Sequence, residues 1–145
     1  MKIGIYLGSF DPIHIGHLSV ITTVQNANLL DYIYVVPAYT NPWKNTSTSI
    51  DDRILFAMMA LEEYPRVYVK DYEKTLHDIT NQNKIYSYKT LEYISSILCQ
   101  HKIFIITTTD TYFTISKWKN GNDILNTYKF IIVDIHEKRN KAQEI

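Results

Sequence analysis

The chain alternates between two kinds of hydrophobic pattern. Short runs of mostly β-branched residues are apolar at nearly every position, which is typical of strands covered on both faces of a sheet. These runs predict five strands, at residues 2–7, 32–38, 67–70, 102–107 and 129–135. Between them, apolar residues recur every three or four positions, which predicts helices at residues 16–28, 49–63 and 87–99 and a pair near 111–127.

This order of elements predicts an α/β fold. Strands that alternate with helices form right-handed βαβ units, and such units build a parallel sheet flanked by helices. A length of 145 residues fits one domain, so we expect a single domain over 1–145 with a mainly parallel, five-stranded sheet. The polar segments 39–48 and 71–85 are predicted to be long loops, and such loops are often functional.

The helix predicted at 49–63 has a clear start. Ser49 is a good N-cap, and Asp51 and Asp52 lie in the first turn, near the positive end of the helix dipole. The apolar positions of this helix follow helical spacing: Ile54, Leu55, Met58, Met59 and Leu61. The spacing predicts that Met58 and Met59 lie in the core.

Composition narrows the classes of partner. Lys and Arg total 15 and Asp and Glu total 15, so no global basic field favours nucleic acid or an anionic membrane. The single cysteine, Cys99, excludes an internal disulfide and a thiolate zinc site. We find no signal peptide and no apolar run of membrane-spanning length, so we expect a cytoplasmic protein with neither nucleic acid nor membrane as partner. Its oligomeric state, including a homo-oligomer, stays open.

The segment "GSFDPIHIGH", from Gly8 to His17, combines loop formers with ionisable groups directly after the first predicted strand. Ligands of open parallel sheets bind beyond the carboxyl ends of the strands, and helix N-termini attract phosphate. With a helix starting near Gly16, His14 and His17 point the same way and can donate hydrogen bonds to phosphoryl oxygens. The alternatives are a plain turn or a metal site formed with Asp11.

The segment resembles the G-[ST]-F-D-P-x-H-x-G-H signature of the nucleotidyltransferase superfamily, whose members share a Rossmann-like fold. Residues 14–17 also spell the HIGH tetrapeptide of class I aminoacyl-tRNA synthetases. The chain is far too short for that class and contains no K-M-S-K-S sequence.

Later segments are similar to those of bacterial nicotinate and nicotinamide mononucleotide adenylyltransferases. "VVPAYTNPWKN" resembles their loop after the second strand, "RILFAMM" their R-x-x-M helix, "YSYKTL" their Y-[ST]-x-D-T-L motif and "FIITTTDTYFTISKW" their Asp and Trp segment. Four residues depart from the family pattern: Leu7, Trp43, Lys89 and Thr108.

The resemblance implies transfer of the adenylyl group of ATP to nicotinate or nicotinamide mononucleotide in NAD biosynthesis. The products are the dinucleotide and pyrophosphate, Mg²⁺ enters with ATP, and no metal-ligating residue is assigned. The implied catalytic residues are His14, His17 and Lys44. The same two histidines are implied to bind ATP together with Gly8, Ser9, Phe10, Thr108 and Asp110. Ser87 and Trp118 are implied to bind the pyridine mononucleotide.

Several of these assignments have structural alternatives. Asp110 could cap a helix, Trp118 could be a core aromatic residue, and Ser87 could be an N-cap. The family's I-S-x-T-x-[IV]-R motif, expected beyond Val133, has no match in 134–145, where a basic run is either replacement charge or a solvated tail. Two other functions therefore stay open: adenylyl or cytidylyl transfer to another acceptor, such as phosphopantetheine, and nucleotide binding without turnover.

Overall fold

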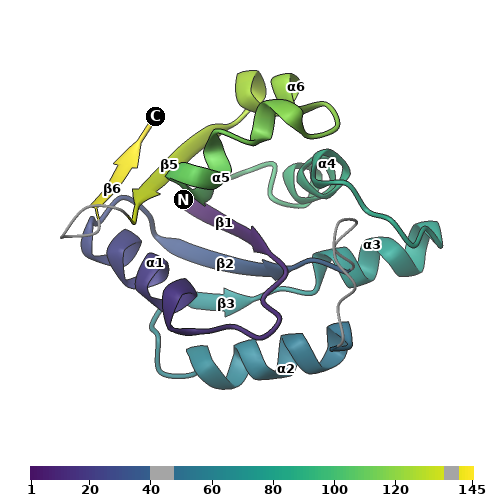
Figure 1. The fold of residues 1–145 in the computed structure, drawn as a ribbon, viewed down its shortest axis with the longest axis horizontal. Helices are drawn as coiled ribbons and strands as arrows, with labels where there is room; N and C mark the ends of the chain where they lie inside the picture. The colour runs from purple at the N-terminus through teal and green to yellow at the C-terminus, as the bar shows by residue number, and fades with distance from the viewer. Residues whose placement is uncertain (40–47, 136–140) are drawn as a thin grey trace.

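A computed structural model describes residues 1–39, 48–135 and 141–145 (Figure 1). Its strands are β1 (Lys2–Gly8), β2 (Tyr32–Pro37), β3 (Val67–Val69), β4 (Lys102–Thr108), β5 (Lys129–Asp134) and β6 (Lys141–Glu144). Its helices are α1 (Ile15–Asn26), α2 (Ile50–Leu61), α3 (Tyr72–Thr80), α4 (Ser87–Ile97), α5 (Thr109–Tyr112), the 3₁₀ helix η1 (Ile115–Lys117) and α6 (Gly121–Thr127). None of these helices is long and apolar enough to span a bilayer.

The strands form one sheet in the order β3-β2-β1-β4-β5-β6. Strands β1 to β5 pair with one another in parallel, which confirms the predicted α/β class and mainly parallel sheet. The predicted count of five strands is wrong, because β6 pairs antiparallel with β5, with Asp134 opposite Lys141 and Ile131 opposite Glu144. The sequence KAQE contains no apolar run, and the backbone bonds that pair an edge strand do not depend on one.

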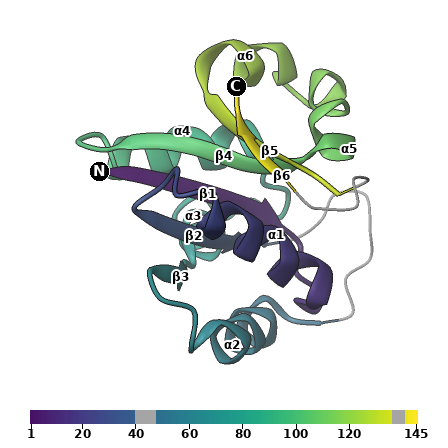
Figure 2. The same cartoon turned by 90° about the vertical axis from the view of Figure 1, so that its left-hand side faces the viewer.

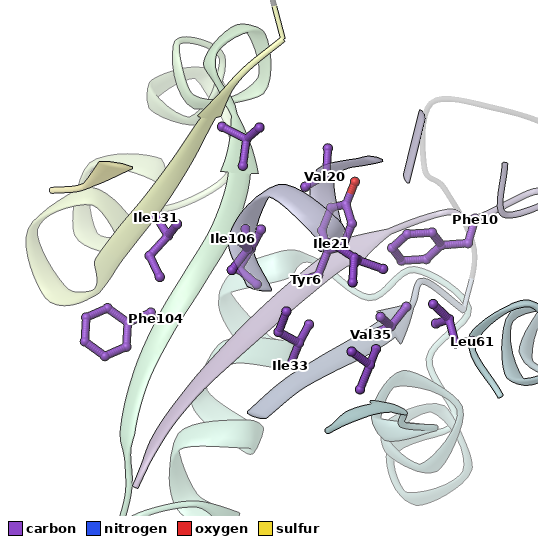
Figure 3. Packing of buried hydrophobic residues seen from close by; sticks show 13 residues of the cluster. Tyr6, Phe10, Val20, Ile21, Ile33, Val35, Leu61, Phe104, Ile106 and Ile131 are labelled. Carbon is purple, nitrogen blue, oxygen red and sulfur yellow. The ribbon is translucent and has the colours of Figure 1, made fainter. Parts of the chain in front are cut away.

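Helices cover both faces of the sheet (Figures 1 and 2). Alternate side chains of β1 point to opposite faces of the sheet. Tyr6 joins the core under α1, whereas Ile3 and Ile5 pack against α4. Figure 3 shows the first layer, in which Val20 and Ile21 of α1 pack over side chains of the strands. Burial on both faces is the physical reason for the continuous apolar runs in the sequence.

Helix α3 lies in the segment 71–85 that was predicted to be a loop, and that prediction is wrong. The helix is short and polar, and it ends at Asn81, whose left-handed φ of 57° lets its N–H donate to the His77 carbonyl at 2.7 Å. Its apolar residues Tyr72, Leu76 and Ile79 follow helical spacing, but the segment is otherwise polar and the residue that it buries is Glu73.

Helix α2 begins as predicted, because the Ser49 hydroxyl accepts the N–H of Asp52 at 3.2 Å. The prediction that Met58 and Met59 lie in the core is wrong, since they are 54% and 65% exposed. The buried residues of the helix are instead Arg53, Ala57 and Leu61, which are spaced four apart and form a narrow stripe.

Candidate active site

The candidate site lies between β1 and β4, where the strand order of the sheet changes direction. From β1, one half of the sheet continues through β2 to β3 and the other through β4 to β5. Gly8 ends β1 and Thr108 ends β4, and the register that places Tyr6 opposite Ile106 puts both residues at the same edge. In open α/β sheets this edge, beyond the carboxyl ends of the strands, forms the ligand-binding crevice.

His14 and His17 cap the first turn of α1 reciprocally. His14 is the N-cap, and its Nδ1 accepts the N–H of Gly16 at 3.0 Å. The Nδ1 of His17 accepts the N–H of His14 at 3.1 Å. These two bonds satisfy backbone donors that the start of a helix leaves free.

The same bonds determine the tautomer of each imidazole. A nitrogen that accepts a hydrogen bond carries a lone pair, so the proton of each neutral ring is on Nε2. Both Nε2–H groups are therefore donors that the cap does not use. Because they lie at a helix N-terminus, the backbone dipole favours an anion at the same place.

The two rings stack on each other, with centroids 3.9 Å apart and an angle of 26° between their planes. Phe10, which is 1% exposed, supports this stack from inside the protein, with its ring centroid 4.8 Å from that of His17 and 5.1 Å from that of Tyr6. Partial burial lowers the pKa of His17 to about 4, and repulsion from His14 makes a smaller contribution in the same direction. His17 is therefore a neutral donor at physiological pH.

Two glycines make room for this arrangement. A Cβ at Gly16 would lie 2.9 Å from Cε1 of His14, and a Cβ at Gly8 would lie 3.1 Å from the ring of Phe10. The left-handed backbone of the loop occurs at Phe10, with φ of 46°, and not at Gly8. Gly8 and Gly16 thus serve the placement of two rings by having no side chain.

A buried side chain of α2, Arg53, holds the backbone of the loop. The carbonyl of Ser9 accepts a hydrogen bond of 2.7 Å from the Nη1 of Arg53 on α2. The predicted catalytic residue Lys44 lies outside the described residues, but the residues on either side of its segment, Tyr39 and Thr48, also bind Arg53 through their carbonyls. Sequence reasoning missed this role of Arg53, although a charged residue in line with Ala57 and Leu61 signals a buried partner.

Thr108 and Asp110 lie at the neighbouring strand end. Thr108 is the N-cap position of α5, and its hydroxyl donates to the Oγ1 of Thr111 at 3.3 Å. Asp110 lies in the first turn of α5 and is exposed, so the alternative that it is the cap of this helix is wrong. The structure thus places both residues beside the switch point, next to the loop that carries the histidines.

Ser87 and Trp118 come from the other face of the sheet. Ser87 is the first residue of α4, whose N-cap is Tyr86, so the alternative of Ser87 as N-cap is wrong. Trp118 follows η1 and packs, half-buried, against the apolar cluster of α4, β5 and α6. Its turn is fixed by Gly121, where a Cβ would lie 1.8 Å from the Ile115 carbonyl oxygen. The site residues therefore form two groups, one at the N-terminus of α1 and the adjoining ends of β1 and β4, and one beside α4.

The donor set at the histidine pair fits an anion better than a metal ion. An Nε2–H group has no lone pair to offer a cation, which argues against the metal site formed by His14, His17 and Asp11. Within residues 1–39, 48–135 and 141–145, no cluster of three His, Cys, Asp or Glu side chains could hold a metal.

A mainly parallel sheet in this strand order, with two Nε2–H donors at a helix N-terminus beside its switch point, is typical of α/β nucleotide-binding domains. The family model described as cytidylyltransferase-like matches residues 5–144, and the chain belongs to this family. This family agrees with the nucleotidyltransferase signature that the segment from Gly8 to His17 resembles.

Curated relatives point to one branch of the family. A protein of Aliarcobacter butzleri is 31% identical over 91% of this chain and 70% of its own length, and one of Caldicellulosiruptor saccharolyticus is 32% identical over 97% and 67%. Both carry the name "Probable nicotinate-nucleotide adenylyltransferase". The chain thus spans about two thirds of the length of these relatives.

Solved structures share the fold. The nicotinic acid mononucleotide adenylyltransferase of Plasmodium falciparum in complex with NaAD has a TM-score of 0.74 at 20% identity, covering 94% of this chain and 76% of its own. The crystal structure of a "Putative Nicotinate-nucleotide Adenylyltransferase" from Vibrio parahaemolyticus has a TM-score of 0.73 at 20% identity, covering 90% of this chain and 76% of its own. These neighbours confirm the Rossmann-like fold.

Proposed function

We propose that this protein transfers the adenylyl group of ATP to nicotinate mononucleotide, forming the dinucleotide and pyrophosphate, as a step of NAD biosynthesis. The observation that carries the proposal is the stacked pair of His14 and His17, whose two Nε2–H donors lie at the N-terminus of α1 beside the switch point. Family membership and the names of the relatives support the reaction and the nicotinate acceptor.

The chemistry needs alignment and charge stabilisation and no nucleophile from the protein. An oxygen of the acceptor 5′-phosphate forms a bond to the α-phosphorus of ATP, and the bond between that phosphorus and the bridging oxygen to the β-phosphate breaks. The electron pair leaves with pyrophosphate. Catalysis of this kind consists of holding two phosphates in line and stabilising negative charge on their oxygens.

The residues at the N-terminus of α1 and at the end of β1 bind ATP in this proposal. His14 and His17 donate from Nε2 to phosphoryl oxygens, and the backbone of Gly8, Ser9 and Phe10 forms the wall of the nucleotide site. Because burial and His14 lower the pKa of His17 to about 4, its ring is neutral before ATP binds and offers its Nε2–H as a hydrogen-bond donor.

The remaining roles follow the family resemblance. Thr108 and Asp110, at the end of β4, contact the adenosine, with Asp110 accepting hydrogen bonds from the ribose. Lys44 adds a positive charge near the phosphates. Trp118 stacks on the pyridine ring, and Ser87 contacts the carboxylate of that ring. Mg²⁺ binds the phosphates of ATP and supplies further charge stabilisation when present.

An acceptor screen tests the proposal. Purified protein is incubated with Mg²⁺ and either ATP or CTP, together with nicotinate mononucleotide, nicotinamide mononucleotide or phosphopantetheine, and products are separated by chromatography. We expect dinucleotide and pyrophosphate with ATP and nicotinate mononucleotide. Product with phosphopantetheine alone would show another acceptor. Binding of ATP by calorimetry without any product would show a nucleotide-binding module and would overturn the proposal.

The proposed reaction takes place in the cytoplasm without nucleic acid or membrane. The balance of acidic and basic residues and the single cysteine support this setting. Cell fractionation with an antibody tests the compartment, and recovery in the membrane fraction would contradict it. Size-exclusion chromatography with light scattering determines whether the protein is a homo-oligomer.

A further inference from the structure

Tyr39 is held through both of its backbone polar groups by buried charged side chains. Its carbonyl oxygen accepts a hydrogen bond of 2.8 Å from the Nη2 of Arg53 on α2. Its N–H donates to the Oε1 of Glu73 on α3 at 2.9 Å. The two charged residues therefore hold this one residue from two different helices, directly before the segment 40–47 in the sequence.

Arg53 joins the candidate ATP loop to this point. The side chain is 1% exposed, and besides Tyr39 it donates to the carbonyls of Ser9 at 2.7 Å, Ala38 at 2.6 Å and Thr48 at 3.2 Å. Hydrogen bonds from an ionised donor are stronger than neutral ones, and a planar guanidinium fixes their directions. One side chain thus sets the position of the Ser9 loop relative to the end of β2 and the start of α2.

Glu73 extends the connection to α4. It is 4% exposed, and its Oε2 accepts a hydrogen bond of 3.0 Å from the hydroxyl of Thr90, three residues after Ser87. Burial raises the pKa of Glu73 to about 7, while the bonds from Tyr39 and Thr90 and the positive charge of Arg53 oppose the rise. The carboxylate therefore links the end of β2 to the helix on which Ser87 lies.

The side chain of Tyr39 is fixed as well. Its ring stacks on the imidazole of His77, with centroids 3.9 Å apart and 12° between the planes. His77 lies on α3, one turn after Glu73, so the same helix holds both the backbone and the ring of Tyr39. The geometry around Tyr39 is therefore set by three side chains.

We propose that Arg53 and Glu73 are positioning residues for the transfer reaction, which through Tyr39 fix the ATP loop at Ser9 against the acceptor helix at Thr90. The expected effect on kcat rests on the proposed function. The expected effect on the local structure around Tyr39 rests on the contacts alone. Neither residue is placed against a substrate. Their role is to keep two substrate-binding groups at a fixed separation, because in-line attack requires the two phosphates to be aligned.

Three substitutions test the two residues separately. Arg53→Lys keeps the positive charge but removes the planar guanidinium, which donates hydrogen bonds to four backbone carbonyls. Glu73→Asp keeps the charge and shortens the side chain by one methylene, so that it cannot reach both Tyr39 and Thr90. Glu73→Gln keeps the reach and removes the charge. Val24→Ala is the matched control, because Val24 is 1% exposed and lies near the far end of α1, so it destabilises the core away from the site.

We expect Arg53→Lys and Glu73→Asp to lower kcat by about 10- to 100-fold with smaller changes in KM, since displacement of bound groups by about 1 Å has effects of this size. Glu73→Gln should retain more activity than Glu73→Asp, and Val24→Ala should keep the wild-type kcat. Independently of activity, hydrogen exchange of the Tyr39 amide measured by NMR should be at least about tenfold faster in Arg53→Lys than in Val24→Ala.

The outcomes separate this inference from the proposed function. Wild-type protein without transfer activity would overturn the proposed function, while the exchange rates still test the positioning contacts. Unchanged exchange at Tyr39 in Arg53→Lys would overturn the inference whatever the activity. Wild-type kcat in both Arg53→Lys and Glu73→Asp, or the same kcat loss in Val24→Ala at equal folded fraction, would overturn it for an active enzyme.

Discussion

The Nδ1 atom of His17 accepts the backbone N–H of His14 at 3.1 Å while the two imidazole rings stack 3.9 Å apart. Each ring thus has one nitrogen committed to the helix start and one donor left for a ligand. Because the structural and the ligand-binding atom of each histidine are different atoms, their roles can be separated by substitution.

His14→Asn tests this separation. An Asn side chain keeps an acceptor at the δ position and is a strong N-cap, but it has nothing at the position of Nε2. We expect kcat to fall by about 100- to 1,000-fold, the size seen when one donor to transition-state charge is removed. Stability should stay within about 1 kcal/mol of the wild type, whereas His14→Ala should lose about 0.5–2 kcal/mol. Steady-state kinetics and urea unfolding measure both effects, and wild-type kcat in His14→Asn would remove His14 from the site.

Gly16→Ala should damage the site without damaging the helix. Alanine is a better helix former than glycine by about 1 kcal/mol, but its Cβ would lie 2.9 Å from the His14 ring. The ring must move and lose its bond to the Gly16 N–H. We expect lower kcat with a midpoint of thermal unfolding close to that of the wild type. If kcat is unchanged, the position of the His14 ring is not critical for transfer.

Most of the fold could be predicted from local pattern. Continuous apolar runs identify β1 to β5 because both of their faces are covered, and Ser49 marks the start of α2. The pattern fails where tertiary contacts decide. Strand β6 is polar and is held by backbone pairing with β5, and Met59 has helical spacing but is exposed among the residues that the structure describes.

The same distinction applies to the site. The ten residues from Gly8 to His17 are consecutive, so their chemistry can be interpreted together from the sequence. The contacts of Arg53 with Ser9 and of Glu73 with Tyr39 join residues 44 and 34 positions apart, and no local pattern pairs them. The sequence signal that remains is a charged residue on a buried helical stripe.

Trp118→Leu tests the acceptor side of the site. A leucine keeps apolar contact with the cluster beside α4 but has no π face for the pyridine ring. Aromatic stacking on a base contributes about 1–3 kcal/mol, so we expect KM for nicotinate mononucleotide to rise about 10-fold or more while KM for ATP changes little. Trp118→Phe is the control, because it keeps a π face and should retain most of the affinity. Equal KM values in all three proteins would make Trp118 a core residue only.

The stability contributed by His17 should depend on pH. Its pKa is about 4 in the folded protein and 6.5 as the ordinary value, so between these values the unfolded chain binds more protons than the folded protein. The free energy of unfolding therefore gains a contribution that is fully present above pH 6.5 and is lost as pH falls toward 4. His17→Asn removes this contribution. The difference in free energy between wild type and variant, measured by urea unfolding, should rise from pH 4 to 6.5 and then stay constant, and a flat difference would contradict the lowered pKa.

The stability contributed by Glu73 should change with pH in the opposite direction. Burial raises its pKa from 4.5 to about 7, so between these values the folded protein binds more protons than the unfolded chain. Stability from this residue is therefore greatest below pH 4.5 and falls as pH rises toward 7, where the buried group ionises. Glu73→Gln keeps the shape and cannot ionise, so the free energy of unfolding of wild type minus that of the variant should decrease from pH 4.5 to 7 and then level off. Because His17 and Glu73 oppose each other between pH 4.5 and 6.5, the wild type alone shows a shallower slope than either effect, and only the variants separate them. A difference that increases with pH would show that Glu73 is ionised throughout and that the charge of Arg53 outweighs the cost of burial.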